Sequence, residues 1–437
     1  MNFLVIGSGA REHIIAEKLS ESGSTVYSVL TNLNPGLLKL SAAYHSVTTY
    51  NSRDSQTSIL NFARENEVRC VVIGPEDPLA NGMADMFWKH DIPVVGPTRQ
   101  LAQIETSKGF TRDLLEKYNI DASPRYKRFK IMNGASEFID TLGEDYVIKF
   151  DGLMGGKGVK VAGEHLHSKE EALIYCKQLV DGSGTYIIEE KIFGEEFSLM
   201  SFCDGRHLAH MPAVQDHKRA YEGDTGPNTG AMGTYSDANH GLPFLTDDDI
   251  TQAREINIAT AKALKDKFEE GYKGILYGGF MATANGVKLI EYNARLGDPE
   301  AMNVLSLLDS DFIEICNGVV DGNIDQVNAR FNNKATVCKY AVPEGYPDSP
   351  VRGQPVDISN IENLDDLFYA SVDIQNGQLV EAGGRTIAVV GVGDTISAAE
   401  RDAEKEVSSI TGPLFHRADV GTNALIQKRV DHMNSLR

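Results

Sequence analysis

Residues 147–159 read VIKFDGLMGGKGV, and this stretch decides how the middle of the chain folds. It begins as a short apolar strand that carries Lys149 and continues as a glycine-rich hairpin that carries Lys157. Glycine backbone can approach phosphate groups closely, and two ammonium groups supply positive charge. The spacing is not that of a P-loop, which requires G-x-x-x-x-G-K followed by Ser or Thr. The stretch predicts a mobile clamp over phosphates, and a plain β-hairpin with solvated lysines is the alternative.

Upstream of this stretch, short β-rich runs alternate with helical patterns, which is typical of a parallel sheet covered by helices. Strands are expected at residues 2–7, 25–31, 68–74 and 92–96. The last two end in Gly-Pro turns, at the carboxyl edge where open α/β sheets bind ligands. We therefore predict an N-terminal Rossmann-like domain over residues 1–103.

The first strand runs into GSGARE at residues 7–12, where a dinucleotide-binding sequence would begin. The third glycine of that sequence is missing, and Thr31 and Asn32 stand where an NAD site has a ribose-binding acid. What remains is a glycine loop at a helix N-terminus, whose N–H groups and dipole favour a phosphate beside Gly9 and Arg11. The alternative is that these glycines only make a tight turn.

Acidic residues end two further strands. Glu76 and Asp77 lie in GPEDP at residues 74–78, where they could hydrogen-bond ribose hydroxyls or merely cap the next helix. The acids in EEK at residues 189–191, together with Glu196, follow an apolar strand. Such a hinge can offer backbone groups to an adenine and a carboxylate to a ribose. On its own this second pattern is weak, because acids at strand ends are commonplace.

The sequence LIEYNAR at residues 289–295 has stronger chemical content. Because side chains alternate along a strand, Glu291, Asn293 and Arg295 project from one face. A carboxylate, an amide oxygen and a guanidinium suit Mg²⁺ together with phosphate oxygens. Asp298 follows directly, in the sequence GDPE. The alternative is a solvated strand face with a Glu–Arg pair.

The rest of the chain completes a multidomain α/β and α+β architecture. A loop rich in Gly, Asp and Asn is expected at residues 215–241, and structureless loops of that length are usually functional. Residues 104–322 are expected to form the central domain, with a mobile lid at about residues 123–193. Strands dominate again beyond it, so residues 323–437 are expected to form a small β-rich C-terminal domain.

Composition excludes several classes of protein. The 437 residues include 42 Lys and Arg against 62 Asp and Glu, and this net charge of -20 would repel nucleic acid. The 5 cysteines are scattered without a C-x-x-C pair, so neither a disulfide framework nor a zinc site is indicated. No signal sequence and no stretch of 18 apolar residues is found. These features predict a cytoplasmic protein that does not bind membranes.

Together, the motifs resemble the phosphoribosylamine–glycine ligase family of the ATP-grasp enzymes. The resemblance runs over nearly the whole chain and is most specific in its last two sequences. It rests on GSGAREH (residues 7–13), GPEDPLANG (74–82), the lysine–glycine stretch, EEKIFGEEFS (189–198), QDHKRAYEGDTGPNTGAMG (215–233) and EYNARLGDPEAM (291–302). It implies an ATP-grasp core in the central domain.

The resemblance also implies roles for individual residues. The residues expected around ATP are Lys108, Lys149, Lys157, Glu189, Glu190, Lys191 and Glu196, with Glu196 on the ribose and Lys157 on the phosphates. Glu291 and Asn293 would hold Mg²⁺ or Mn²⁺. The residues expected around glycine and its acyl phosphate are Asp216, Lys218, Arg219 and Arg295. The candidates for binding phosphoribosylamine are Gly9, Arg11, Glu76, Asp77 and Asp298.

Three positions depart from the family pattern. Ala231 stands where the loop usually has a second glycine, and Leu296 and Met302 stand where bacterial members often have Phe and Gln. These changes affect subfamily preferences more than the reaction.

The implied reaction joins glycine to 5-phosphoribosylamine and releases ADP and phosphate. It gives glycinamide ribonucleotide in de novo purine biosynthesis through glycyl phosphate, because a carboxylate is a poor electrophile until it is phosphorylated. The site must therefore hold ATP, a carboxylate and an amine in line, with positive charge around the moving phosphoryl group. The partners would be these small molecules, and the protein would be a monomer or a dimer.

Two other functions remain open. One is another ATP-grasp carboxylate–amine ligase that acts on a different nucleotide. The other is a nucleotide-binding sensor without catalysis. The presence of Glu291, Asn293 and Arg295 argues against the sensor, because a pure binding module has no need of a metal–phosphate triad.

Overall fold

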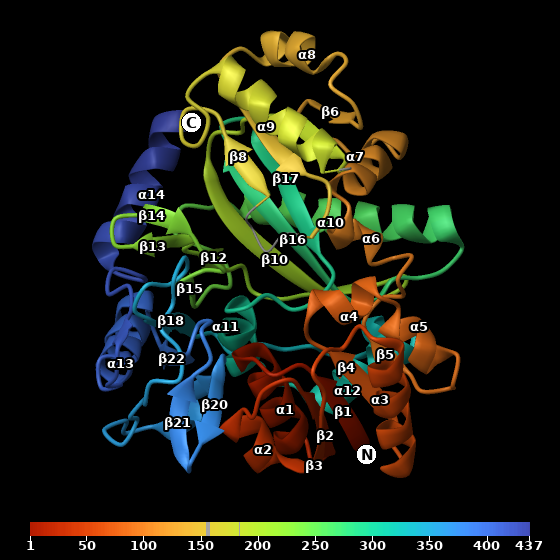
Figure 1. Ribbon diagram of the computed structural model, residues 1–437, viewed down its shortest axis with the longest axis vertical. Helices are drawn as coiled ribbons and strands as arrows, with labels where there is room; N and C mark the ends of the chain where they lie inside the picture. The colour runs from red at the N-terminus through yellow and green to blue at the C-terminus, as the bar shows by residue number, and fades with distance from the viewer. Residues whose placement is uncertain (154–157, 183) are drawn as a thin grey trace.

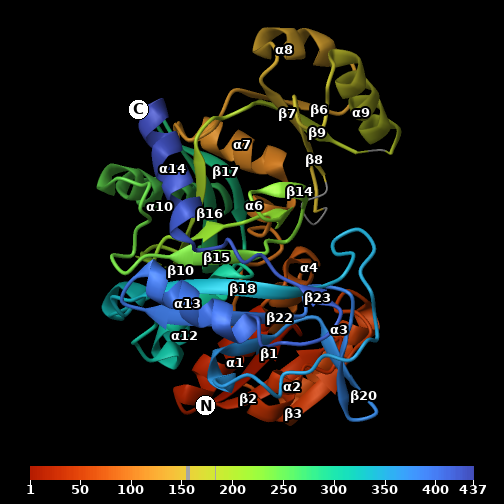
Figure 2. The ribbon, with the colours of Figure 1, turned by 90° about the vertical axis from the view of Figure 1, so that its left-hand side faces the viewer.

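The computed structural model describes residues 1–153, 158–182 and 184–437. Lys157 lies outside the described residues. Figure 1 shows a parallel sheet with its helices at one end, a small antiparallel sheet at the opposite end, and the remaining sheets between them. The C-terminal helices lie along one side of the molecule (Figures 1 and 2).

The predicted N-terminal parallel sheet is confirmed, with strand order β3-β2-β1-β4-β5. Its strands are β1 (Asn2–Ile6), β2 (Thr25–Leu30), β3 (Ser41–Ser46), β4 (Cys70–Ile73) and β5 (Val94–Val95). The helices of this unit are α1 (Ala10–Glu21), α2 (Pro35–Leu40), α3 (Arg53–Glu65), α4 (Glu76–Ala80) and α5 (Met83–Trp88). The sequence did not predict β3, because this edge strand alternates between half-buried and exposed residues and lacks an apolar run.

Two short helices, α6 (Gln103–Thr106) and α7 (Lys108–Lys117), follow the parallel sheet. Ser107 between them has an extended backbone and caps α7, because its hydroxyl accepts from the Phe110 N–H at 3.0 Å. The same hydroxyl donates to Asp151 at 2.9 Å. This break places Lys108 at the first residue of α7.

The small sheet has the order β6-β9-β7-β8, and all of its pairs are antiparallel. Its elements are β6 (Tyr126–Phe129), α8 (Ala135–Leu142), β7 (Tyr146–Phe150), β8 (Val159–Val161), α9 (Lys169–Asp181) and β9 (Tyr186–Glu190). It has its own apolar core, which includes Ile148, Cys176 and Ile188. The elements of this unit lie within residues 123–193, the range in which a mobile lid was predicted.

A second antiparallel sheet, with the order β11-β10-β16-β17, forms the floor beneath the small one. Its elements are β10 (Glu195–Asp204), β11 (Leu208–His210), β16 (Lys273–Thr283) and β17 (Gly286–Asn293), with helices α10 (Asp247–Phe268), α11 (Glu300–Ser306) and α12 (Phe312–Asp321). The β16–β17 hairpin turns at Gly286, where φ is 101° and glycine is favoured. The hairpin fixes the strand that carries LIEYN at residues 289–293.

The expectation of a structureless loop at residues 215–241 was wrong. This segment contains β12 (Gln215–Asp216), β13 (Arg219–Tyr221), β14 (Thr225–Asn228) and β15 (Gly233–Ser236). Inside the segment, β13 pairs with β14 and β12 pairs with β15, pairings that its loop-like composition did not indicate. β15 pairs with both β12 and β18 (Ala335–Pro343), so its strand character was invisible in the local pattern.

The largest sheet joins the central and C-terminal parts of the chain, with the order β12-β15-β18-β22-β19. Its remaining strands are β19 (Leu367–Tyr369), β22 (Ile387–Gly393) and β23 (Leu414–Phe415), the last of which pairs with β18. The other elements of this part are the β20 (Val372–Gln375) and β21 (Gln378–Glu381) ribbon, α13 (Ile396–Val407), α14 (Asn423–Leu436) and the 3-10 turns η1 (Ile324–Gln326) and η2 (Leu364–Asp366). One sheet therefore crosses the domain boundary predicted at residue 323.

None of the helices in the described ranges combines the length and the apolar character needed to cross a membrane.

Candidate functional site

A cavity of about 500 Å³ lies where the parallel sheet, the central sheets and the C-terminal part meet. Many of its lining residues are ionisable and come from all three parts of the chain. These residues are Arg11, Glu76, Glu105, Lys108, Asp216, Lys218, Glu291, Arg295, Asp298, Glu300 and Arg385. Phe150 and Val159 of the small sheet line the same cavity. A cavity lined by so many charges of both signs suits a charged ligand better than an apolar one.

The end of β17 supplies the expected metal ligands. Glu291 and Asn293 are half-buried and line the cavity, whereas Tyr292 between them is buried. Burial alone would raise the pKa of Glu291, but Lys108, Lys218, Lys149 and Arg295 together lower it below its usual value. Glu291 is therefore ionised and can bind a divalent cation.

These two residues fit a metal that also binds phosphate. Within the described residues, no group of three carboxylate, imidazole or thiol ligands gathers in this cavity; the one such group, Asp204, His207 and Asp325, is not among the cavity's lining residues. Glu291 and Asn293 alone would leave most of the octahedral positions of Mg²⁺ vacant. Phosphate oxygens and water must complete such a site, as is usual for Mg²⁺ bound with a nucleotide.

Arg295 follows β17 on the same face and is held by acids from other elements. Its guanidinium lies 3.3 Å from the Glu105 carboxylate and 3.6 Å from that of Glu76. Burial opposes the charge on Arg295, but Glu105 and Glu76 raise its pKa above the ordinary value. Glu105 also accepts from the Ala294 N–H at 2.8 Å, which fixes the chain beside Arg295.

Lys149 of β7 belongs to a buried ion-pair network next to this cavity. Its ammonium lies 2.6 Å from Glu189, which also pairs with Arg112 at 2.7 Å. Burial would raise the pKa of Glu189, but Arg112 and Lys149 lower it to about 2. Arg112 donates further to the Leu289 carbonyl at 2.9 Å. The network ties the small sheet to β17.

The other residues expected around ATP are divided between two places. Glu190 and Lys191 line a separate cavity of about 490 Å³, where Glu190 pairs with Arg125 at 2.9 Å. Glu196 pairs with Lys218, which lines the first cavity. Lys108 lines that first cavity as well, at the N-terminus of α7.

Of the residues expected around glycine, some line the first cavity and one does not. Asp216 and Lys218 line the first cavity with their side chains 3.8 Å apart. Burial raises the pKa of Asp216 to about 7, with Lys218 opposing the shift and Glu300 and Glu196 adding to it. Arg219 is not among the lining residues, because its guanidinium pairs with Glu164 beyond β8 at 2.6 Å.

A third cavity, of about 290 Å³, lies at the N-terminus of α1 and includes Gly9, Tyr50 and Ser371 in its lining. Arg11 and Asp298 line both this cavity and the first. Contacts within α1 occupy part of the predicted phosphate site. The Glu12 carboxylate accepts from the Gly9 N–H at 2.7 Å and from Arg11 at 2.6 Å. Glu76 lines the first cavity, whereas Asp77 is exposed and lines none of the three.

Arg385 is a cavity residue that the sequence analysis missed. It precedes β22 and lines both the first and the third cavities. Its guanidinium lies 3.1 Å from the Asp298 carboxylate, donates to the Ala231 carbonyl at 3.0 Å, and lies over the Tyr340 ring at 4.4 Å. No local motif marks it; only the pairing of β18 with β22 brings it to the site.

The three departures from the family pattern occupy different environments. Ala231 has φ of 80°, in the left-handed region that favours glycine, which explains why glycine is expected there. Leu296 and Met302 are buried in an apolar cluster with Phe312. Their side chains act through packing, while the backbone carbonyl of Leu296 accepts from Arg11 at 3.2 Å and from Arg295 at 3.3 Å.

Comparisons with known proteins cover the whole chain. The models of phosphoribosylglycinamide synthetase match residues 1–105 (N domain), 106–301 (ATP-grasp domain) and 336–423 (C domain). A phosphoribosylamine–glycine ligase of Methanosarcina barkeri is 45% identical over 439 residues, and one of Methanococcus maripaludis (strain C5) is 47% identical over 447 residues. Each alignment covers 100% of both chains.

Solved structures agree with these sequence matches. The crystal structure of a phosphoribosylamine–glycine ligase from Thermotoga maritima has a TM-score of 0.81 and 27% identity, covering 96% of this chain and 100% of that one. A biotin carboxylase domain from Hydrogenobacter thermophilus, solved with MgADP, shares the fold at a TM-score of 0.74 and 14% identity, covering 99% of this chain and 93% of that one. The full-length identity to curated relatives, together with the match of all three domain models, shows that the chain belongs to the phosphoribosylglycinamide synthetase family and has an ATP-grasp domain at its centre.

Proposed function

We propose that the protein joins glycine to 5-phosphoribosylamine at the expense of ATP, giving glycinamide ribonucleotide, ADP and phosphate. One observation carries this proposal within the family. Ionisable side chains from all three parts of the chain converge on the 500 Å³ first cavity, and that cavity shares Arg11, Asp298 and Arg385 with the third cavity, at the α1 N-terminus. A ligase needs this arrangement, because its activated acid must meet an amine that arrives from another pocket.

ATP would extend from the small sheet toward Lys108 and Glu291. Lys149 and Glu189, from the paired strands β7 and β9, would hold the small sheet against β17 beside the triphosphate, and Glu196 would bind the ribose. Glu291 and Asn293 would hold Mg²⁺ or Mn²⁺, and a bound divalent cation would neutralise charge on the β- and γ-phosphates. Lys157 remains a candidate for the γ-phosphate.

Glycine would lie between Asp216, Lys218 and Arg295. The Asp216 carboxylate can pair with the ammonium group of glycine, and the two cations can orient its carboxylate toward the γ-phosphorus. Transfer of the phosphoryl group gives glycyl phosphate and ADP. The charges of Lys218 and Arg295 would stabilise the equatorial oxygens during this transfer. Arg219 would act from outside the cavity lining, through its contact with Glu164.

Phosphoribosylamine would occupy the 290 Å³ cavity, with its phosphate near Gly9 and Arg11. Glu76 and Asp298 would contact its ribose or orient its amine, and Asp77 would contribute from the exposed surface beside Glu76. The amine nitrogen then attacks the carbonyl carbon of glycyl phosphate, and inorganic phosphate leaves. We further propose three domains at residues 1–103, 104–322 and 323–437, a cytoplasmic location, and a monomeric or dimeric protein.

The decisive experiment measures ADP release with and without each substrate. ADP release that requires both glycine and phosphoribosylamine supports the proposal. Dependence on a different acid or amine would indicate another carboxylate–amine ligase, and nucleotide binding without turnover would indicate a sensor. Glycine labelled with ¹⁸O in its carboxylate tests the intermediate, because glycyl phosphate must pass one labelled oxygen to the released phosphate. Unlabelled phosphate would exclude it.

A further inference from the structure

The hairpin formed by β13 and β14 has one side toward the first cavity and the other toward the C-terminal segment. Lys218 precedes the hairpin and Asn228 ends it, and both line the cavity. The Thr229 N–H donates to the Lys218 carbonyl at 2.7 Å, which closes the base of the hairpin. A shift of the hairpin would therefore also shift Lys218 and Asn228 in the cavity wall.

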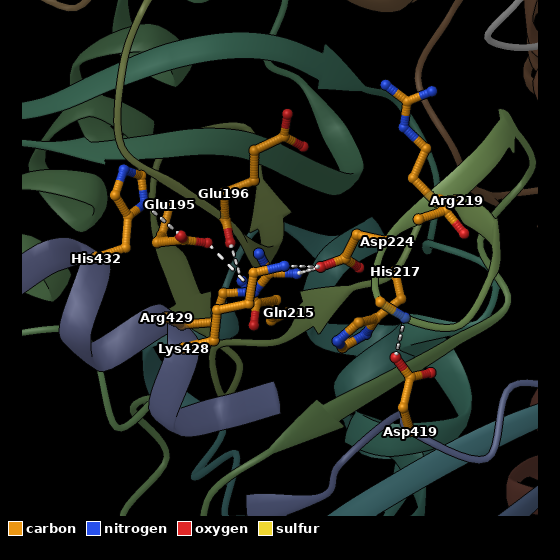
Figure 3. Close-up of polar contacts among 12 residues, drawn as sticks. Glu195, Glu196, Gln215, His217, Arg219, Asp224, Asp419, Lys428, Arg429 and His432 are labelled. Carbon is orange, nitrogen blue, oxygen red and sulfur yellow. Dashed lines mark hydrogen bonds and ion pairs between the residues drawn. The ribbon is translucent and has the colours of Figure 1, made fainter. Parts of the chain in front are cut away.

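Asp224 at the hairpin turn is held by two arginines of the C-terminal segment. Its carboxylate accepts from Arg417 at 3.1 Å and from Arg429 at 2.5 Å. Asp224 has φ of 62°, so the turn adopts a backbone that a non-glycine residue rarely takes without support. Figure 3 shows Asp224 facing the arginine of helix α14.

Arg417 fixes the hairpin at further points. Its side chain has 0% exposure and pairs with Asp419 at 2.7 Å, while it donates to the Arg219 carbonyl at 3.2 Å. Asp419 in turn accepts from the Gly223 N–H at 2.8 Å. The turn that connects β13 to β14 is thus bonded to the segment that follows β23, and so is the backbone of β13.

Helix α14 also contacts the strand next to the hairpin. Glu195 and Glu196 are neighbours in β10 and point to opposite faces. Glu196 pairs with Lys218 on the cavity side, whereas Glu195 accepts from His432 at 2.6 Å and lies 3.4 Å from Arg429. Figure 3 shows Arg429 between Glu195 and Asp224, so one guanidinium links the strand to the hairpin.

Helix α14 also docks through apolar side chains. Leu425, Ile426 and Met433 of α14 are already buried against the rest of the molecule. Ion pairs shielded from water add little net stability, since desolvation offsets much of their attraction, and in some proteins they are retained for the geometry that they specify. A network that ties Asp224 from two sides serves to orient the hairpin.

We propose that Arg417 and Arg429 are positioning residues, which hold the β13–β14 hairpin in the place where Lys218 and Asn228 line the glycine side of the cavity. This inference rests on the proposed function for the identity of the ligand. It gives the C-terminal segment a role in substrate binding although neither arginine lines the cavity.

The test compares Arg429→Gln with Arg429→Lys and with a matched control, Arg437→Gln. Arg437 lies at the end of the same helix and pairs with Asp249 of α10 at 2.6 Å, away from the hairpin. We expect Arg429→Gln to raise the KM for glycine by roughly tenfold and to leave the KM for ATP within about twofold, because the hairpin carries Lys218 and Asn228 whereas Glu196 is held in β10 by the pairing of that strand with β16. Arg429→Lys should recover most of the loss, and Arg437→Gln should change neither KM.

Hydrogen exchange provides a readout that does not depend on activity. Amides of residues 219–229 should exchange faster in Arg429→Gln and unchanged in Arg437→Gln. A variant that only melts at a lower temperature, with unchanged glycine KM and hairpin exchange, would overturn the inference. An equal rise in the KM for glycine and for ATP would also overturn it. Failure of the proposed function would appear separately, as ADP release by the unmodified protein that does not depend on glycine. In that case, exchange of the hairpin amides would still show whether Arg429 positions the hairpin.

Discussion

Glu291 shows how one side chain depends on its neighbours for its charge. It lies half-buried at the end of β17, where four cations keep its pKa low. We expect Glu291→Gln to lower kcat by roughly a hundredfold or more, because the amide lacks the negative charge that attracts the cation while its shape is unchanged. The melting temperature should hardly move. Glu255→Gln on the exposed face of α10 is the control, and near-normal turnover of Glu291→Gln would reject the metal assignment.

Asp216 is the residue whose protonation should be visible in kinetics. Its pKa of about 7 means that the carboxyl group is neutral at lower pH and ionised at higher pH. If its carboxylate binds the ammonium of glycine, kcat/KM for glycine should rise between about pH 6 and about pH 8 and should then level off. Asp216→Asn should abolish that rise. A pH profile that is the same in both proteins would assign the titration to another group.

At the scale of elements, the N-terminus of α1 tests the division of the site into two cavities. Arg11 is buried, pairs with Glu12 and donates to the Leu296 carbonyl at 3.2 Å. We expect Arg11→Ala to raise the KM for phosphoribosylamine by roughly tenfold with little change in the KM for ATP. Lys18→Ala, which breaks a pair with Glu21 at the other end of α1, is the matched control. A selective loss of ATP affinity would mean that the two ligands occupy the opposite cavities.

The elements also show what the sequence could and could not predict. Alternation along LIEYNAR placed Glu291, Asn293 and Arg295 on one face, and the structure brings all three to one cavity. Local patterns work there because the face is set by the strand itself. Arg385 and strand β15 depend on β18, which lies far away in the sequence. Arg219 failed to join the lining because Glu164 competes for its guanidinium, a contact that no pattern around Arg219 encodes.

At the scale of the whole molecule, buried histidines link distant parts of the chain and make stability depend on pH. The Nδ1 of His13 on α1 accepts from the Tyr369 N–H of β19 at 3.2 Å, and burial, with Lys39, lowers the pKa of His13 to about 3. His217 beside the C-terminal arginines has its pKa lowered to about 3 by burial, Arg417 and Arg429. Both histidines are neutral in the folded protein.

An unfolded chain binds protons at these histidines below about pH 6.5, whereas the folded chain does not. The contribution of these two histidines to stability is therefore fully present above that pH and falls as pH decreases, by up to about 2 kcal/mol for each histidine at about pH 5. Asp216, Glu17 and Glu381, whose pKa values are raised to about 7, contribute with the opposite sign, so the test is the difference between proteins: in thermal melts between about pH 7 and about pH 5, His13→Asn should lose less stability on acidification than the unmodified protein. The exposed His167→Gln should leave the slope unchanged. Equal slopes in all three proteins would place the pH dependence elsewhere.

The sheet that joins the central and C-terminal parts has a consequence for folding during synthesis on the ribosome. β15 ends at Ser236, but its partner β18 begins only at Ala335. At about 5–20 residues per second, a ribosome needs on the order of seconds to make the intervening chain and release β18 from its exit tunnel. During that interval one edge of β15 has no partner, so a nascent chain arrested shortly after α12 should recruit chaperones that the finished protein does not need.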